Sequence, residues 1–217
     1  AGTVLERKYR VDKVVAEGGF GVVYIGHHLG LDVPIAVKVL KRSGDLSSDA
    51  WQDLLARFVQ EAKTMAKLRH PNVVAVLDTG VADIDDGSVP WMVMEWIEGE
   101  TLRDDLLPRR GQPGRKPVEC LSLLRPVMQA IAEAHEMGIA HRDIKPTNVL
   151  VAMHDGAPVS KVIDFGIAKA IGERLTDKTL FTNFAQMVGT PLYMSPEQAQ
   201  LGGLDIDTRS DIYSLGV

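Results

Sequence analysis

The first hundred residues alternate apolar and polar positions in the way that strands do, with β-branched residues on either side of a glycine cluster. Five segments show this pattern and are expected to be strands: Tyr9–Ala16, Gly21–His28, Val33–Leu40, Val73–Val81 and Pro90–Trp96. Between the third and fourth, apolar residues recur at helical spacing from about Ala50 to Arg69, where His70-Pro71 ends the pattern. The pattern predicts a sheet accompanied by one helix.

The second half of the chain predicts mainly helix and loop. Val118–Met137 has the spacing of a long helix, with Pro126 as a break or an entry point and Gly138 as a C-cap. Short apolar strands are expected at Val149–Val151 and Lys161–Ile163. The predicted fold class is therefore α+β, with the strands gathered first and the helices later.

Composition narrows the class of protein. The chain has 217 residues, 45% of them hydrophobic and 24% charged, which is typical of one large globular domain or two small lobes. Its formal net charge of −5 argues against a general nucleic-acid binder. Cys120 is the only cysteine, so no internal disulfide can form, and a reducing compartment is the simplest expectation. No apolar run is long enough for a transmembrane helix, and the first residues lack the apolar stretch of a signal peptide, so none is expected in this segment.

One segment carries a specific chemical signature. His141–Asn148 reads His-Arg-Asp-Ile-Lys-Pro-Thr-Asn and resembles the H-R-D-x-K-P-x-N catalytic loop of protein kinases. Together with Tyr193–Gln198, which reads Tyr-Met-Ser-Pro-Glu-Gln, the wording is similar to bacterial members of the eukaryotic-like (Hanks-type) serine/threonine kinases. The resemblance covers the whole chain. It implies a bilobal fold, with a five-stranded antiparallel N-lobe sheet and one helix in residues 1–97, and a partial, mainly helical C-lobe in residues 98–217.

The resemblance also implies the parts of a phosphoryl-transfer site. The enzyme must position ATP and neutralise charge, because the transition state is loose and spreads charge over the γ-oxygens. Asp143 would orient the acceptor hydroxyl, and Lys145 would reach the γ-phosphate. Asp164, in Asp164-Phe165-Gly166, and Asn148 would bind Mg²⁺ (or Mn²⁺), since hard cations prefer oxygen ligands. An isolated Asp-Phe-Gly is usually a turn, but here it lies at the family's spacing from Asp143.

A glycine cluster between the first two predicted strands resembles the phosphate-covering loop G-x-G-x-x-G-x-V. It comprises Ala16, Glu17, Gly18, Gly19, Phe20 and Gly21. Glycine allows the backbone N–H groups to approach phosphates closely. Ala16 stands where the family has its first glycine, which weakens the match. Taken by itself, a plain hairpin turn explains this segment equally well.

The third predicted strand ends in Ile35-Ala36-Val37-Lys38, which resembles the V-A-I-K strand of kinases. Lys38 would hold the α- and β-phosphates, and Glu61 on the helix would be its partner, because a buried lysine needs one. The alternative is an edge-strand Lys38 and a solvated Glu61. The adenine site implied by the resemblance consists of Val23, Ala36 and Leu150 around the ring, Met94 as gatekeeper, and the backbone of Glu95 and Ile97 at the adenine edge.

The segment from Asp164 to Glu197 resembles the activation segment, with Ser195-Pro196-Glu197 in place of A-P-E. Thr190 resembles the threonine that contacts the catalytic Asp and Lys in Ser/Thr kinases. Candidate phosphosites are Thr176, Thr179 and Thr182, with Thr179 or Thr182 favoured, and Arg142 would receive the phosphate. Exposed loop threonines without a role are the alternative for at least one of them.

Two further packing roles are implied by the resemblance. Asp211 would brace the backbone of the catalytic loop, and it is also placed as a helix N-cap. A regulatory stack would form from Met65, Val76, His141 and Phe165.

Three functions remain in competition. The leading one is an active Ser/Thr protein kinase that uses ATP and Mg²⁺, phosphorylates protein substrates and self-associates for autophosphorylation. The second is a pseudokinase scaffold, which only Ala16 and the chain's end at Val217 favour. The third is a small-molecule kinase, but such kinases typically lack the Lys-Pro pair and the Ser-Pro-Glu segment that this chain has. Because Val217 lies inside a predicted helix, a fragment is expected. It would be cytoplasmic, without excluding a membrane anchor beyond residue 217.

Overall fold

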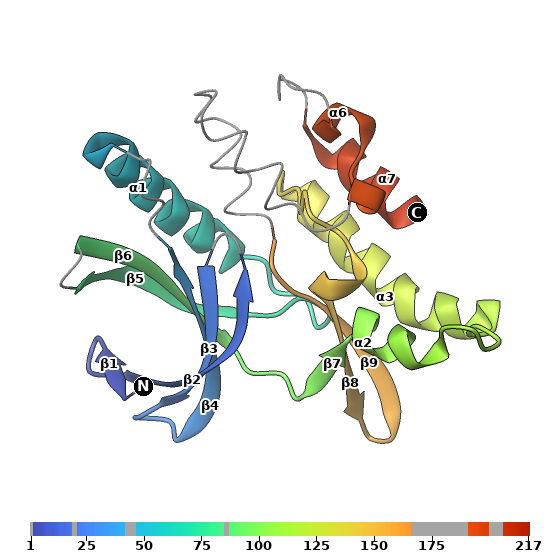
Figure 1. The fold of residues 1–217 in the computed structure, drawn as a ribbon, viewed down its shortest axis with the longest axis horizontal. Coiled ribbons are helices and arrows are strands. Elements are labelled where there is room, and N and C mark those ends of the chain that lie inside the picture. The colour runs from blue at the N-terminus through green and yellow to red at the C-terminus, as the bar shows by residue number, and fades with distance from the viewer. Residues whose placement is uncertain (1, 19–20, 42–46, 85–86, 166–190, 200–205) are drawn as a thin grey trace. The chain divides into compact units, whose positions relative to one another are not determined.

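The computed structural model describes residues 2–18, 21–41, 47–84, 87–165, 191–199 and 206–217 (Figure 1). These residues fall into two compact units. The first unit comprises the described residues up to Lys67 together with Ala75–Trp96. The second comprises Leu68–Val74 and the described residues from Ile97 onward.

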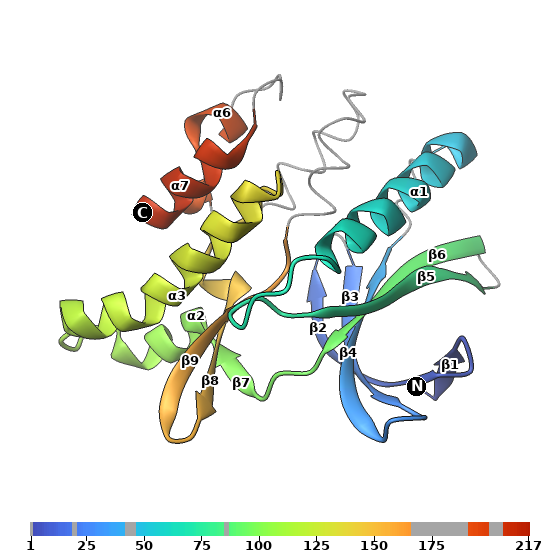
Figure 2. The same cartoon turned by 180° about the vertical axis from the view of Figure 1, so that it is seen from behind.

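The first unit is built on a curled antiparallel sheet of six strands in the order β1-β2-β3-β4-β6-β5 (Figures 1 and 2). The strands are β1 (Thr3–Leu5), β2 (Tyr9–Gly18), β3 (Gly21–His28), β4 (Val33–Leu40), β5 (Val76–Ile84) and β6 (Gly87–Glu95). The sequence predicted five strands and missed β1, which is too short to show a period of two. Glu6 and Arg7, at φ 48° and 55°, form the turn that folds β1 back onto β2.

One hydrophobic cluster of this unit lies on one face of the sheet. Val37 pairs with Val93 across β4 and β6, and both are fully buried. The cluster consists of Tyr9, Val11, Ile35, Val37, Trp91 and Val93. Because successive side chains of a strand point to opposite faces, Ala36 and Lys38 face away from this cluster.

Helix α1 (Ser48–Met65) completes the first unit and packs against β5 and β6. Ser47 caps it by accepting the backbone N–H of Ala50. Five apolar residues at helical spacing form its buried face: Trp51, Leu55, Phe58, Ala62 and Met65. The indole N–H of Trp51 donates to the Ser88 carbonyl at 2.9 Å and ties the helix to β6.

The helix ends earlier than predicted, at Met65 instead of Arg69. The N–H of Lys67 donates to the Thr64 carbonyl, which tightens the last turn and stops the α-helical ladder. Leu68 then leaves the helix and is buried in the second unit, at 3% exposure. The apolar spacing therefore extends beyond the end of the helix, because Leu68 is buried as part of the second unit and not as part of α1.

The second unit combines a small sheet with helices. Its elements are β7 (Gly99–Thr101), α2 (Leu102–Leu106), a 3₁₀ turn (Leu107–Arg109), α3 (Pro117–Glu136), a 3₁₀ turn (Pro146–Asn148), β8 (Val149–His154), β9 (Ala157–Val162), a 3₁₀ turn (Pro191–Tyr193), α6 (Pro196–Ala199) and α7 (Thr208–Gly216). The antiparallel order β7-β8-β9 brings Thr101 opposite Leu150 and Leu150 opposite Lys161. The sequence missed β7 and α2, which have three and five residues.

Helix α3 is continuous, so the expectation of a break or an entry at Pro126 was wrong. The helix instead begins at Pro117, where proline costs no hydrogen bond. Its buried residues, which include Ala130 and Ala134, pack the helix against β9. Gly138, at φ 73°, directly follows the last turn, and its predicted role at the C-terminus is confirmed.

Residues Leu68–Val74 run beside β9 and extend the small sheet. The Val74 N–H donates to the Val162 carbonyl at 2.9 Å, and the Val162 N–H donates to the Asn72 carbonyl at 2.7 Å. The predicted strand at Val73–Val81 was therefore placed too early, because β5 begins at Val76. No helix in the described ranges has both the length and the apolar character needed to cross a bilayer.

Candidate active site

Three residues of the His141–Asn148 loop meet around one carboxylate. Lys145 Nζ lies 2.9 Å from Asp143 Oδ2. The Asn148 amide donates to the Asp143 carbonyl at 2.8 Å and to Asp143 Oδ2 at 3.0 Å. Asn148 is buried, whereas 21% of the Asp143 side chain is exposed. The loop thus holds the Asp143 carboxylate in a fixed orientation beside the Lys145 ammonium group. Such a pair is suited to position a substrate hydroxyl next to a phosphate.

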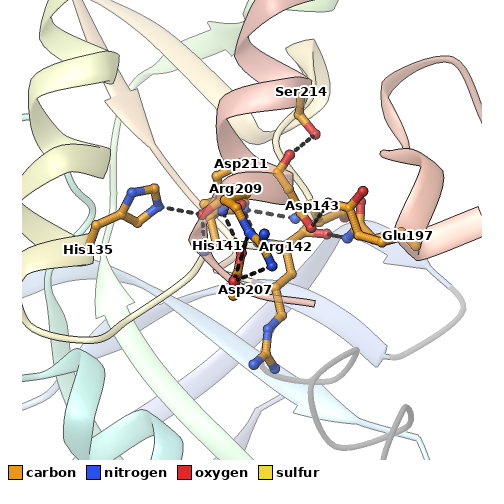
Figure 3. A network of polar contacts seen from close by, with 11 residues as sticks. His135, His141, Arg142, Asp143, Glu197, Asp207, Arg209, Asp211 and Ser214 are labelled. Carbon is orange, nitrogen blue, oxygen red and sulfur yellow. Dashed lines mark hydrogen bonds and ion pairs between the residues drawn. The ribbon is translucent and has the colours of Figure 1, made fainter. Parts of the chain in front are cut away.

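The backbone of this loop is held by a buried carboxylate on α7 (Figure 3). Asp211, at 0% exposure, accepts the backbone N–H of His141 through Oδ2 and that of Arg142 through Oδ1, both at 2.7 Å. His135 Nε2 on α3 contacts Asp211 Oδ2 at 2.8 Å. The predicted bracing role of Asp211 is confirmed. Its placement as the N-cap was wrong, because Asp207 caps α7 by accepting the Arg209 N–H.

The His141 side chain holds the backbone on either side of it in space, at Asp143 and at Ile163. Its Nε2 contacts the Ile163 carbonyl at 3.0 Å, and its Nδ1 accepts the Asp143 N–H at 3.2 Å. A carbonyl requires a donor and an N–H requires an acceptor, so the ring is neutral with its proton on Nε2. Burial lowers the pKa of His141, which favours the same neutral form. The ring also packs on Phe165, with centroids 4.6 Å apart, as the resemblance predicted for this part of the stack.

Asp164 is separated from the end of β9 by one residue, Ile163, whose backbone is hydrogen-bonded to the predicted catalytic loop. The Ile163 N–H donates to the Asn148 carbonyl at 3.0 Å, so the two predicted metal ligands come from segments that are joined by their backbones. Asp164 has φ 55°, which non-glycine residues seldom adopt. Such strain often accompanies a functional position.

The donor set fits a hard cation. Asn148 uses its amide N–H groups on Asp143, so its Oδ1 is the atom left to bind a metal. A carboxylate and an amide oxygen are suitable ligands for Mg²⁺, which usually keeps phosphate and water in its other positions. No cluster of three His, Cys, Asp or Glu side chains with metal-site spacing occurs among the described residues. The Asp164 and Asn148 ligand pair stays a prediction.

In the first unit, the strand register gathers predicted nucleotide residues on one face of the sheet. Val23 is paired with Ala16 on β2 and with Lys38 on β4. Ala36 is paired with Met94 on β6. Directly paired residues share a face, and Ala36 and Lys38 are two apart on one strand. This face is opposite the one that carries Val37 and its cluster.

The comparisons with known proteins agree with this chemistry. The model of the protein kinase domain matches residues 9–217. The chain belongs to the protein kinase family. It is 39% identical over 212 residues to the serine/threonine-protein kinase PknB of Mycobacterium leprae, covering 98% of this chain and 32% of that protein. It is 41% identical over 211 residues to a probable serine/threonine-protein kinase of Streptomyces coelicolor, covering 96% and 29%.

The fold agrees with a solved kinase domain as well. The crystal structure of the Mycobacterium tuberculosis PknI kinase domain superposes with a TM-score of 0.69 at 27% identity, covering 99% of this chain and 73% of that one. The predicted fold class is confirmed: the chain has the α+β fold of a kinase domain, with an antiparallel sheet in its first part and helices in its incomplete second part. The chain spans about a third of the length of the two curated relatives, 32% and 29%.

The glycine loop of the kinase domain is described at its two ends. A Cβ at Gly21 would lie 2.3 Å from the Val39 carbonyl oxygen, so only glycine fits where β3 approaches β4. A Cβ at Gly18 would meet nothing within 4 Å. Glu17 forms an ion pair with Lys41 at the end of β4, a contact that the sequence did not suggest. Gly19 and Phe20 lie outside the described residues.

The predicted hinge residues carry specific backbone contacts. The Glu95 N–H donates to the Ala75 carbonyl at 3.0 Å, and the Ala75 N–H donates to Glu95 Oε1 at 2.9 Å. Met94 is buried, at 7% exposure. Glu61 lies on α1, adjacent to the fully buried Ala62. Its pairing with Lys38 stays a prediction.

The end of the predicted activation segment is tied to α7. Ser210 Oγ donates to Glu197 Oε1 at 2.6 Å, and this hydrogen bond lowers the pKa of Glu197. Ser214 Oγ donates to the Tyr193 carbonyl at 2.6 Å. Sequence reasoning missed both serines. Thr190 and the candidate phosphosites Thr176, Thr179 and Thr182 lie outside the described residues.

Proposed function

We propose that this chain is the catalytic part of a serine/threonine protein kinase, which transfers the γ-phosphoryl group of ATP to Ser or Thr hydroxyls of proteins. The cluster of Asp143, Lys145 and Asn148 carries this proposal, since it joins an oriented carboxylate to a cation. The Ser/Thr-kinase names of relatives near 40% identity support the acceptor class, as does Lys145 two residues after Asp143. Residues 1–97 form the N-lobe with the hinge, and residues 98–217 form part of the C-lobe.

The residues divide the chemistry among them. Asp143 accepts a hydrogen bond from the acceptor hydroxyl and takes its proton late in the transfer. Lys145 stabilises negative charge on the γ-phosphate, and Thr190 helps to hold the Asp143 and Lys145 side chains. Asn148 and Asp164 would hold a Mg²⁺ ion, which would supply positive charge to neutralise the phosphates.

The sheet face described above would hold the nucleotide. Lys38 contacts the α- and β-phosphates and is oriented by Glu61, while the backbone of residues 16–21 covers the phosphates. Val23, Ala36 and Leu150 enclose the adenine ring beside Met94. The backbone of Glu95 and Ile97 reads the adenine edge.

Regulation would follow from the activation segment. Arg142 Nε is buried and has no hydrogen-bond partner in the described part of the chain, which supports a role in receiving a phosphate. The source of that phosphate is a second copy of the kinase, through transient self-association. The enzyme works in the cytoplasm, where ATP is available.

A phosphoryl-transfer assay tests the proposal. The purified protein is incubated with labelled ATP, Mg²⁺ and a generic protein acceptor, and phosphoserine and phosphothreonine are quantified. Asp143→Asn should reduce transfer by about 10²-fold or more at unchanged folding. Nucleotide binding without turnover would favour a pseudokinase. Label on soluble alcohols instead of protein would favour a small-molecule kinase.

A further inference from the structure

The peptide that joins Arg142 to Asp143 is held at both of its polar groups. Its carbonyl accepts a hydrogen bond from Gln198 Nε2 at 2.8 Å, and its N–H donates to His141 Nδ1 at 3.2 Å. Arg142 itself has φ 63°, in the left-handed region that non-glycine residues seldom adopt. An unusual backbone conformation persists only when its surroundings hold it. Gln198 therefore helps to set the direction in which Asp143 leaves the backbone.

The orientation of the Gln198 amide is itself fixed by Ser195, in an arrangement that matches the side-chain-to-backbone half of a capping box. Ser195 is fully buried, and its N–H and Oγ–H point to Gln198 Oε1 at 3.1 and 3.3 Å. The Ala199 N–H donates to the Ser195 carbonyl at 3.0 Å, and Pro196 occupies the first helical position. With Oε1 committed to Ser195, the amide nitrogen is directed at the Arg142 carbonyl.

Capping alone does not explain an amide at this position. The capping box needs only an acceptor three residues after the cap, and a glutamate supplies one as well as a glutamine. The Arg142 carbonyl, however, needs a donor, which a carboxylate lacks. The choice of glutamine is thus explained by the contact that reaches the catalytic loop, 56 residues away in sequence.

We propose that Gln198 is a positioning residue for phosphoryl transfer, which links the folded turn Ser195–Ala199 at the end of the activation segment to the peptide that carries Asp143. The proposal rests on the kinase function proposed above. When the turn is formed, Gln198 Nε2 holds the Arg142 carbonyl and Asp143 is aligned. When the turn is lost, the Arg142 carbonyl loses this donor and Asp143 loses part of its alignment. Order in the activation segment is thereby communicated to the catalytic carboxylate.

Gln198→Glu separates the two halves of this link, because it keeps the acceptor for Ser195 and removes the donor for Arg142. We expect kcat to fall by about tenfold or more, with KM for ATP unchanged and the unfolding temperature lowered by only a few degrees, about the cost of one hydrogen bond. Protonation of the introduced carboxyl restores a donor. The ratio of variant to wild-type kcat should therefore rise from about pH 8 to about pH 5. Gln112→Glu, the same change in an exposed loop, should alter none of these values.

A second measurement does not depend on activity. Hydrogen exchange of the peptide covering His141–Asn148 should be faster in Gln198→Glu than in the wild type and in Gln112→Glu. Unchanged exchange in Gln198→Glu would overturn the proposal, and so would a kcat equal to that of the wild type. A kcat that is lost together with a strongly lowered unfolding temperature, and that does not recover at low pH, would overturn it as well. If the wild type transfers no phosphate, the proposed function fails, and the exchange rates alone decide whether Gln198 positions the loop.

Discussion

Asp211 Oδ1 accepts the backbone N–H of Arg142 at 2.7 Å, although the two residues are 69 positions apart in the sequence. The same carboxylate accepts the His141 N–H and contacts His135, so one fully buried group fixes two peptides and a side chain. The loop that carries Asp143 thus depends on α7, the last helix of the second unit.

Asp211→Asn should destabilise the protein and slow it. The amide offers only one acceptor where two N–H donors converge, so one buried donor is left without a partner. We expect the free energy of unfolding to fall by about 3 kcal/mol and kcat to fall with it. Denaturant unfolding and steady-state kinetics measure the two effects. Asp207→Asn is the control, because Asn caps a helix as well as Asp. Equal stability of the two variants would contradict this role of Asp211.

Gly21→Ala should lower stability by about 1–3 kcal/mol, because the new Cβ would lie 2.3 Å from the Val39 carbonyl oxygen and the strands must move apart. Gly18→Ala serves as the matched control, since its Cβ would meet nothing within 4 Å. Thermal unfolding of both variants checks the difference. If Gly18→Ala lost as much stability as Gly21→Ala, close approach of β3 and β4 would not be the cause.

The sequence predicted the parts that are local or that follow a familiar motif. The strands at Gly21–His28 and Val33–Leu40 were placed correctly from their alternating pattern. The role of Asp211 followed from the family resemblance. In contrast, the contact of Gln198 with Arg142 joins residues far apart in sequence, and no periodicity records it. The motif Ser195-Pro196-Glu197-Gln198 could have indicated the capping box, but its direction toward the catalytic loop depends on tertiary packing.

Leu68 and β1 show two other limits. Leu68 continues the apolar spacing of α1 and yet belongs to the second unit, because burial of an apolar residue does not reveal which core it enters. Thr3–Leu5 forms a strand because Glu6 and Arg7 turn the chain back, and three residues are too few to show a pattern. Boundaries set by tertiary contacts are thus the least readable from sequence.

Tyr9 should make stability depend on pH at the alkaline end. Burial, together with its hydrogen bond to Asp78 Oδ2 at 2.8 Å, raises the pKa of Tyr9 to about 12. The unfolded chain releases this proton near its ordinary pKa of about 10, so the contribution of Tyr9 is complete below about pH 10 and is lost as pH rises toward 12.

Tyr9→Phe should therefore cost about 1–2 kcal/mol at neutral pH, and the gap to the wild type should shrink above about pH 10. Denaturant unfolding at several pH values measures this gap. Tyr213→Phe, at an exposed position, should leave stability unchanged throughout. A gap that stays constant or widens at alkaline pH would contradict the assignment.

Phosphate should appear within Thr176–Thr182 after incubation with ATP and Mg²⁺. Arg142 supports this expectation because its buried Nε has no hydrogen-bond partner in the described ranges. Phosphopeptide mapping by mass spectrometry should find Thr179 or Thr182 modified in the wild type and unmodified in Asp143→Asn. Phosphate that is found only at other positions would remove the activation-loop assignment.

Lys38→Met should abolish most of the activity while the fold is retained. Lys38 lies on the sheet face opposite the cluster that contains Val37 and Val93, so methionine can fill its place without disturbing that cluster. The variant loses the positive charge that we assign to the α- and β-phosphates, and kcat/KM should fall by about 10²-fold or more. Phosphoryl-transfer kinetics and thermal unfolding are measured together. Lys41→Met is the matched control, because Lys41 ends the same sheet region, pairs with Glu17 and is well exposed at 46%. An unchanged rate in Lys38→Met, or an equal loss in Lys41→Met, would refute the phosphate role of Lys38.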